Sequence, residues 1–213
     1  MHCHDCFSWQ TTDMTGVGGA HWTGPSARKS ELLELAYRYA LAHGLADLSL
    51  RPLAAAIGSS PRVLLYLFGS KEALIRALLA RARAEELDLL DRLRQGGDAR
   101  TAGGLDGAAA EVWTWLAADS QRALLHLWVE GYARSLVDAD GPWAGFARST
   151  VEDWLVVLAE AQPADERHTA SGLAQRTRVL AVLRGALLDL LATGDVVRTT
   201  AALHQELASR QVI

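Results

Sequence analysis

Cysteine is scarce in this chain: only two occur among 213 residues, Cys3 and Cys6. Both lie near the start, so no disulfide framework holds the fold together. With His2 and His4 they offer four zinc ligands, and the gap of two residues between the cysteines suits a pair of thiolates. The second half of a usual zinc module is missing, so we expect no metal site. Residues 1–25, which lack hydrophobic periodicity, are predicted to form a disordered tail.

Long apolar runs are also missing. None approaches the roughly 18 residues that a membrane-spanning helix requires. The opening residues, MHCHDCFSW, lack the basic and apolar regions of a signal peptide. We therefore expect a cytoplasmic protein without a membrane partner.

Catalytic motifs are absent as well. The sequence contains no glycine-rich phosphate loop, no H-E-x-x-H and no G-x-S-x-G. Glu152 and Asp153 are neighbours in sequence, so their carboxylates diverge around a helix and do not form a catalytic pair. We therefore expect a protein that is not an enzyme and has no cofactor.

Apolar residues, by contrast, make up half of the chain and recur at helical spacing. This pattern predicts an all-α protein, with a helix-turn-helix domain over residues 26–72 and a larger helical domain over residues 73–213. The long helix that starts at residue 70 is expected to bury Leu74, Ala77, Leu78 and Leu87, with Leu90 or Leu93. Helices are expected over residues 26–43, 49–57, 70–94, 107–118, 120–137, 142–161, 172–193 and 196–208, with a short helix from residue 61 and a loop over residues 95–107.

Residues 49–70 carry the start and stop signals of two short helices in succession. Ser49 is placed to cap the first helix and Gly58 to end it. Ser60 and Pro61 form a favourable start for the second helix, and Ser70 begins the long one. Two helices joined by a tight glycine turn are typical of the helix-turn-helix, whose second helix enters the major groove of DNA.

The second short helix has two different faces. Leu64, Leu67 and Phe68 share one face at helical spacing and are expected to be buried. Arg62 and Tyr66 point the other way. A short helix with an arginine and a tyrosine on its outer face suits a DNA groove.

Charge is distributed unevenly along the chain. Residues 26–83 hold nine Lys or Arg and four acidic residues, a balance of +5, whereas the whole chain has a net charge of −4. The residues after Arg83 therefore carry a net charge of −7, since the first 25 contribute two acids and no Lys or Arg. This asymmetry favours contact between the amino-terminal part and phosphates.

The run SLRPLAAAIGSSPRVLLYLFGSKEALIRALL, preceded by LLELAYRYALAHGLADL, resembles the amino-terminal domain of TetR-type (tetracycline-repressor-like) transcriptional regulators. The likeness covers roughly residues 28–80. Where that family commonly has a tyrosine this chain has Leu65, with Tyr66 next along, whereas Lys71 fits the family pattern directly. The resemblance implies a homodimer that binds DNA and has a small-molecule effector site in its second domain.

These features predict a dimeric, sequence-specific regulator, a repressor that a small apolar or aromatic effector releases from a near-palindromic operator in double-stranded DNA. The alternative is an all-helical interaction module or small-molecule-binding protein that does not bind DNA. In the first interpretation Arg62 contacts a base edge, with help from Ser60. The residues expected to contact phosphates are Arg28, Ser49, Tyr66 and Lys71.

Most aromatic residues lie in the second domain. Tryptophans at helical spacing are often core residues, yet several together can line an apolar cavity that holds a small molecule. The family resemblance favours the cavity. The candidate effector-binding residues are Trp113, Trp128, Tyr132 and Trp154.

Two sets of charged residues in this domain have structural explanations. Arg184 stands among leucines, where we expect a paired structural charge, with contact to an anion in the pocket as the alternative. The other set recurs every four residues, which predicts a solvated stripe with weak pairing along one helix. Its members are Arg122, His126, Glu130 and Arg134.

The segment VLAVLRGALLDLLATGD is apolar nearly all round, so both of its sides are expected to be buried. One side can face its own domain, and the same surface of a second chain can cover the other, with Val197, Ala201 and Leu203 of the last helix joining a four-helix contact across a two-fold axis. A core helix within one chain is the alternative. The candidate interface residues are Leu180, Leu187, Leu191 and Leu203.

Overall fold

The computed structural model describes residues 25–209 apart from 46, 96 and 139. This part of the chain contains helices and no strand, so the expected all-α fold is confirmed. Residues 1–24 of the predicted tail lie outside the described residues. They include the four candidate zinc ligands, His2, Cys3, His4 and Cys6. The elements are α1 (Pro25–His43), α2 (Leu50–Ala56), α3 (Pro61–Phe68), α4 (Lys71–Gln95), α5 (Gly97–Leu116), a 3-10 turn (Asp119–Gln121), α6 (Arg122–Val137), α7 (Phe146–Glu160), α8 (Ala170–Thr193) and α9 (Val196–Ser209).

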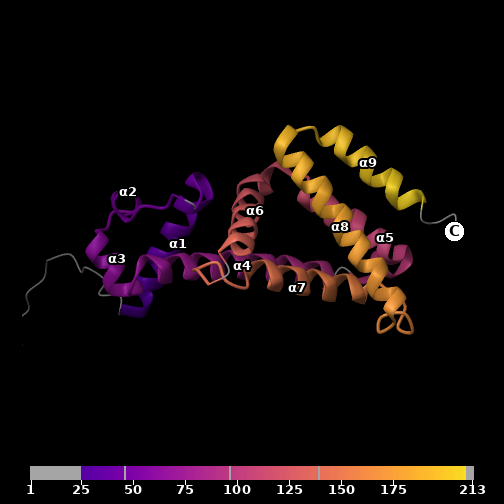
Figure 1. The fold of residues 1–213 in the computed structure, drawn as a ribbon, viewed down its shortest axis with the longest axis horizontal. Helices are drawn as coiled ribbons and strands as arrows, with labels where there is room; N and C mark the ends of the chain where they lie inside the picture. Colours follow the sequence, from indigo (N-terminus) through magenta and orange to yellow (C-terminus); the bar gives the residue numbers. More distant parts are fainter. Residues whose placement is uncertain (1–24, 46, 96, 139, 210–213) are drawn as a thin grey trace, which may run out of the picture.

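Helices α1 to α3 pack together at one end of the molecule (Figure 1). Helix α1 ends as predicted because Gly44 has φ +79°, which glycine adopts without strain. Helix α2 begins after Ser49, although the Ser49 side chain makes no capping hydrogen bond. Leu53 and Ala54 are buried from α2. The predicted pair of short helices is therefore confirmed.

Helix α3 begins where the sequence predicts. The Ser60 hydroxyl oxygen accepts a hydrogen bond from the backbone N–H of Val63 at 3.2 Å, and Pro61 occupies the first helical position. Leu64 and Phe68 are buried, which confirms the predicted inner face. The cap and the buried face together fix which residues the helix presents outward.

Helix α4 joins the two halves of the molecule (Figure 1). The Ser70 hydroxyl oxygen caps it by accepting from the N–H of Ala73 at 3.1 Å. Leu74 and Leu90 are buried as predicted, but Leu87 is 39% exposed and the prediction for it is wrong. At 3.6 residues a turn, Leu87 lies roughly 220° round the helix from Leu74, so the two cannot share a face. The predicted domain boundary falls at the start of this helix and stays a prediction.

The loop predicted over residues 95–107 is also wrong. Helix α5 starts at Gly97 and runs through the glycine-rich segment. Its one interruption is Gly104, with φ +57° and ψ −148°, a conformation that residues with a side chain avoid. The glycines here allow a kink within a helix instead of a loop between helices.

Helices α5 to α9 build the larger half. Helix α7 begins at Phe146, four residues later than predicted, because residues 141–145 form turns and Gly145 has φ +77°. Helices α8 and α9 pack against each other at the end of the molecule away from α3 (Figure 1). No helix in the described part of the chain is long and apolar enough to cross a membrane.

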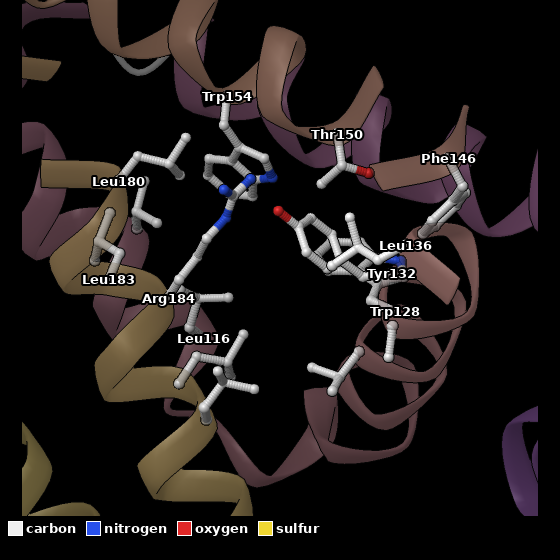
Figure 2. A pocket seen from close by; sticks show the side chains of 15 residues that line it. Leu116, Trp128, Tyr132, Leu136, Phe146, Thr150, Trp154, Leu180, Leu183 and Arg184 are labelled. Atoms are coloured by element: carbon white, nitrogen blue, oxygen red, sulfur yellow. The ribbon is translucent and has the colours of Figure 1, made fainter. Parts of the chain in front are cut away.

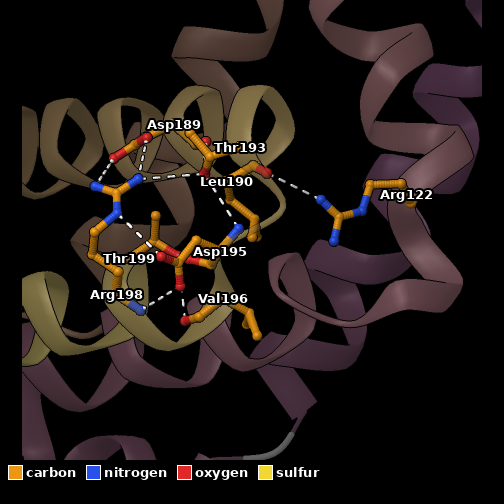
Figure 3. Close-up of polar contacts among 8 residues, drawn as sticks. All are labelled: Arg122, Asp189, Leu190, Thr193, Asp195, Val196, Arg198 and Thr199. Carbon is orange, nitrogen blue, oxygen red and sulfur yellow. Dashed lines mark hydrogen bonds and ion pairs between the residues drawn. The ribbon is translucent and has the colours of Figure 1, made fainter.

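The corner between α8 and α9 is held by polar contacts (Figure 3). Arg198 donates to both carboxylate oxygens of Asp189, at 2.8 and 2.7 Å, and holds the pKa of that carboxyl below its usual range. Asp195 accepts from the backbone N–H of Arg198 at 3.0 Å and so caps α9. Arg122 donates to the carbonyl of Leu190 at 3.2 Å, which ties the start of α6 to this corner.

The predicted solvated stripe on α6 is wrong for Glu130. The Oε2 atom of Glu130 accepts a partly buried hydrogen bond from the backbone N–H of Leu45, at 2.9 Å. Gly44 makes this contact possible, because its positive φ turns the chain at the end of α1 so that the next N–H faces α6. Helix α6 is therefore bonded directly to the amino-terminal half. His126 is exposed, as the stripe predicts.

Candidate functional site

Helix α3 presents an exposed face on the amino-terminal half. Arg62 is exposed, Tyr66 is 82% exposed and Leu65 is 41% exposed. The outward direction predicted for Arg62 and Tyr66 is confirmed. A guanidinium group can donate two parallel hydrogen bonds to a guanine edge, and a phenol hydroxyl can donate to a phosphate. This face is the candidate nucleic-acid interface.

The other predicted DNA-contacting residues stand near helix starts. Ser49 precedes α2 and is exposed, and Ser60 already serves as the cap of α3. Lys71 opens α4, where the helix dipole favours an anion. Arg28 forms a surface ion pair with Glu31 through its Nη1, at 2.7 Å, which leaves other guanidinium donors for a phosphate. Their contacts with DNA stay predictions.

The second half contains a pocket of about 300 Å³ between α5, α6, α7 and α8 (Figure 2). An engineered cavity of roughly 150 Å³ is enough to hold benzene, so this one has room for a larger ligand. Leu136 on α6 and Leu188 on α8 line it and are themselves exposed, which leaves the pocket open to solvent. The lining residues are Val112, Leu116, Trp128, Val129, Tyr132, Ala133, Leu136, Phe146, Thr150, Trp154, Leu180, Leu183, Arg184, Leu187 and Leu188.

Three of the four aromatic residues predicted to contact an effector line this pocket: Trp128, Tyr132 and Trp154. The prediction for Trp113 is wrong, because its ring is buried outside the pocket and its Nε1 donates to the hydroxyl of Thr200 at 2.9 Å. That hydrogen bond joins α5 to α9, so Trp113 belongs to the core.

Arg184 departs from the prediction of a paired charge. Its guanidinium lies over the ring of Tyr132, with 5.0 Å from Cζ to the ring centroid. The Nη2 atom is buried and has no hydrogen-bond partner among the described residues. Arg184 is the one charged residue among those that line the pocket.

Glu86 is the residue that sequence reasoning missed. It lies on α4 with no exposed surface, and its Oε1 accepts from the indole N–H of Trp154 at 2.6 Å. Burial raises the pKa of Glu86 to about 7, against the opposing effects of the Trp154 bond and of the positive charges of Arg83 and Arg184. Arg83 itself is paired with Asp153 at 2.6 Å. The sequence offered one signal for Glu86: it is an acidic residue at helical spacing between the buried apolar residues Ala82 and Leu90 of α4.

We expect Glu86→Gln to stabilise the protein at pH 8. The ordinary pKa of this carboxyl is 4.5, so folding raises it, and the stability of the native state falls as the pH rises from 4.5 to about 7. Full ionisation costs at most about 3 kcal/mol, a penalty that glutamine avoids while its amide oxygen still accepts from Trp154. Urea unfolding of both proteins at pH 5 and pH 8 measures this. An advantage of the variant that is no larger at pH 8 than at pH 5 contradicts the assignment.

The predicted dimer interface needs correction. Leu180 and Leu203 are buried within their own chain, and Leu180 and Leu187 line the pocket. Leu191 is half-buried against the core. Val197 and Ala201 on α9, which the sequence also placed at the contact, are exposed, and so is a row of small residues on α8: Ala174, Ala181, Gly185 and Ala192. The error arose because a helix that is apolar all round gives no sequence signal for which side faces its own core.

Comparison with protein families agrees with this arrangement. Residues 32–78 match the family described as bacterial regulatory proteins, tetR family, so the resemblance drawn from the sequence is confirmed. No curated protein sequence matches the chain.

Several solved structures share the fold. A transcriptional regulator from Rhodococcus sp. Rha1 is 18% identical, with a TM-score of 0.67 over 85% of this chain and 94% of the other. Escherichia coli NemR in its reduced form is 19% identical, with a TM-score of 0.62 over 82% and 94% of the two chains. The multidrug binding protein EbrR complexed with imidazole is 22% identical, with a TM-score of 0.59 over 84% and 88%. At these identities the likeness concerns the fold.

Proposed function

We propose that the protein is a dimeric, sequence-specific DNA-binding regulator controlled by a small molecule; the match of residues 32–78 to the family described as bacterial regulatory proteins, tetR family, supports this proposal. The observation that carries the proposal is the outer face of α3, where Arg62 and Tyr66 are exposed while the inner face is locked in the core. Two such helices in a dimer read half-sites roughly 34 Å apart, which makes the operator near-palindromic.

The pocket supports the part of the proposal that concerns the effector. A structure of similar fold is that of a multidrug binding protein complexed with proflavin. In this chain the pocket is bounded by α6, which also carries the Glu130 bond to Leu45. A ligand that moves α6 therefore acts directly on the end of α1, next to the DNA-binding helices. We propose that the bound effector lowers operator affinity and that the protein is a repressor.

The bond between Glu130 and Leu45 should be measurable as stability. Glu130→Ala leaves the N–H of Leu45, a fully buried residue, without its acceptor, which costs about 1–3 kcal/mol. Glu130→Gln keeps an acceptor oxygen at the same place, so we expect a smaller loss. Urea unfolding of both variants tests this; equal losses show that the hydrogen bond does not join the two halves.

Salt titration of DNA binding tests the proposed function. When a regulator neutralises phosphates of duplex DNA, the logarithm of its binding constant falls linearly with the logarithm of the salt concentration. The slope is about −0.9 for each phosphate contact. Mixed-sequence DNA is sufficient for this measurement. We expect such a slope for the wild-type chain and a shallower one for Lys71→Ala. Absence of DNA binding at low salt favours the second candidate, a helical module that binds small molecules without DNA.

A further inference from the structure

The walls of the pocket are mostly apolar, and the few polar groups on them are mainly hydrogen-bond donors. Four side chains that line it carry polar atoms besides Trp154, whose N–H is already bonded to Glu86. These are Arg184 and Trp128, which only donate hydrogen bonds, and Thr150 and Tyr132, whose hydroxyls can also donate.

Three of these groups lack a partner within the described residues. The Nη2 atom of Arg184, the indole N–H of Trp128 and the hydroxyl of Thr150 are buried and make no hydrogen bond there. Trp128 is only 7% exposed, so water has little access to its ring. A buried donor without an acceptor is costly, and a bound ligand that supplies acceptors removes that cost.

The charge of Arg184 narrows the class of ligand further. Guanidinium stays protonated, and no acidic side chain lines the pocket. Glu86 is the carboxyl whose Oε1 accepts from the indole N–H of Trp154, and the charge of Arg184 acts on it and lowers its pKa. Its Oε2 and the Nη2 of Arg184 both lack a hydrogen-bond partner in the described part of the chain. Glu86 neutralises Arg184 only in part, because burial raises its pKa to about 7. A ligand that brings its own negative charge is therefore favoured over a neutral or cationic one.

Figure 2 shows how the polar groups are grouped. The Arg184 guanidinium and the Tyr132 hydroxyl lie near each other beside Trp154, with Leu180 and Leu183 at the left of the view and Leu116 below them. The stacking of Arg184 on Tyr132 holds the guanidinium without using its hydrogen-bond donors. The pocket thus offers one cationic donor group and a long apolar wall.

We propose that the effector of this protein is a hydrophobic monocarboxylate, whose carboxylate pairs with Arg184 and whose aromatic or aliphatic body fills the apolar part of the pocket. This inference rests on the proposed function, because it names the ligand class of the same effector site. A single arginine balances one negative charge, which favours a carboxylate over a doubly charged phosphate.

Calorimetric titration with ligands of matched shape and different charge tests the proposal. The probes are 2-naphthoate, 2-naphthamide and 2-naphthylmethylammonium, with decanoate, decanamide and decylammonium as a second series. On the full wild-type chain we expect the carboxylate of at least one series to bind at least about tenfold tighter than its amide, and the ammonium to bind weakest. The proposal is overturned if a neutral or cationic probe binds as tightly as the carboxylate in both series, or if neither carboxylate binds.

Variants on α8 locate the effect. Arg184→Met keeps an unbranched apolar side chain without the guanidinium and should abolish the preference for carboxylate, whereas Arg184→Lys, which keeps the charge, should retain part of it. Arg178→Met is the matched control, because Arg178 is exposed on the same helix and paired with Glu206 away from the pocket. Circular dichroism checks that each variant is helical. Unchanged selectivity in folded Arg184→Met contradicts the role of Arg184.

The two proposals fail in different ways. Carboxylate selectivity in a protein that does not bind DNA overturns the proposed function and leaves the ligand class standing. Salt-dependent DNA binding without carboxylate selectivity overturns the ligand class and leaves the proposed function standing.

Discussion

Replacing Arg62 by alanine should abolish most of the sequence preference of the protein while leaving its general attraction to DNA. Arg62 is exposed on the outer face of α3, and a bidentate contact to guanine contributes about 1–3 kcal/mol of discrimination. A symmetric dimer makes the contact twice, so the expected loss on an operator selected from random DNA is roughly 30-fold to 20,000-fold. Fluorescence anisotropy with operator and scrambled duplexes measures both affinities.

Lys71→Ala is the control for this prediction. A phosphate contact carries no sequence information, so its loss should weaken operator and scrambled DNA by the same factor and flatten the salt dependence. If Arg62→Ala instead loses equal affinity for both duplexes, Arg62 does not read a base.

Gly185→Arg should convert the protein from a dimer to a monomer. Gly185 is exposed on α8, and a Cβ added there meets no described atom of its own chain within 4 Å. Its own chain therefore accommodates the arginine, which also improves the helix. Across a two-fold axis, by contrast, two guanidinium groups clash and repel. Loss of the second half-site contact should lower operator affinity by roughly 10²-fold to 10⁴-fold.

Analytical ultracentrifugation and operator binding test this prediction together. Val156→Arg is the matched control, since Val156 is an exposed apolar residue on a different helix, α7. The control should stay dimeric. A Gly185→Arg variant with the mass of two chains shows that the dimer, if one forms, does not use this face of α8.

Local signals made the amino-terminal half predictable. Ser60 and Ser70 cap their helices through hydrogen bonds to residues three positions along the chain, so short-range sequence patterns contain the whole interaction. The buried positions Leu64 and Phe68 follow from helical periodicity in the same way. The orientation of Arg62 is then fixed by geometry.

The features that were missed depend on contacts between residues far apart in sequence. Glu130 bonds to Leu45, and Glu86 to Trp154, and no local pattern identifies either partner. Leu180 was assigned to the outside of α8 although it lines the pocket. Hydrophobic periodicity shows that such a helix is buried, but tertiary packing decides which of its sides faces the core of its own chain.

Selection of bound sequences from a pool of random duplex DNA with the wild-type chain tests whether the protein reads DNA as a dimer through α3. The account predicts enrichment of an inverted repeat whose half-sites are about one helical turn apart, with a guanine at the base position that becomes degenerate when the selection is repeated with Arg62→Ala. Recovery of unenriched sequences, or of a motif without two-fold symmetry, contradicts a dimer that reads DNA through α3.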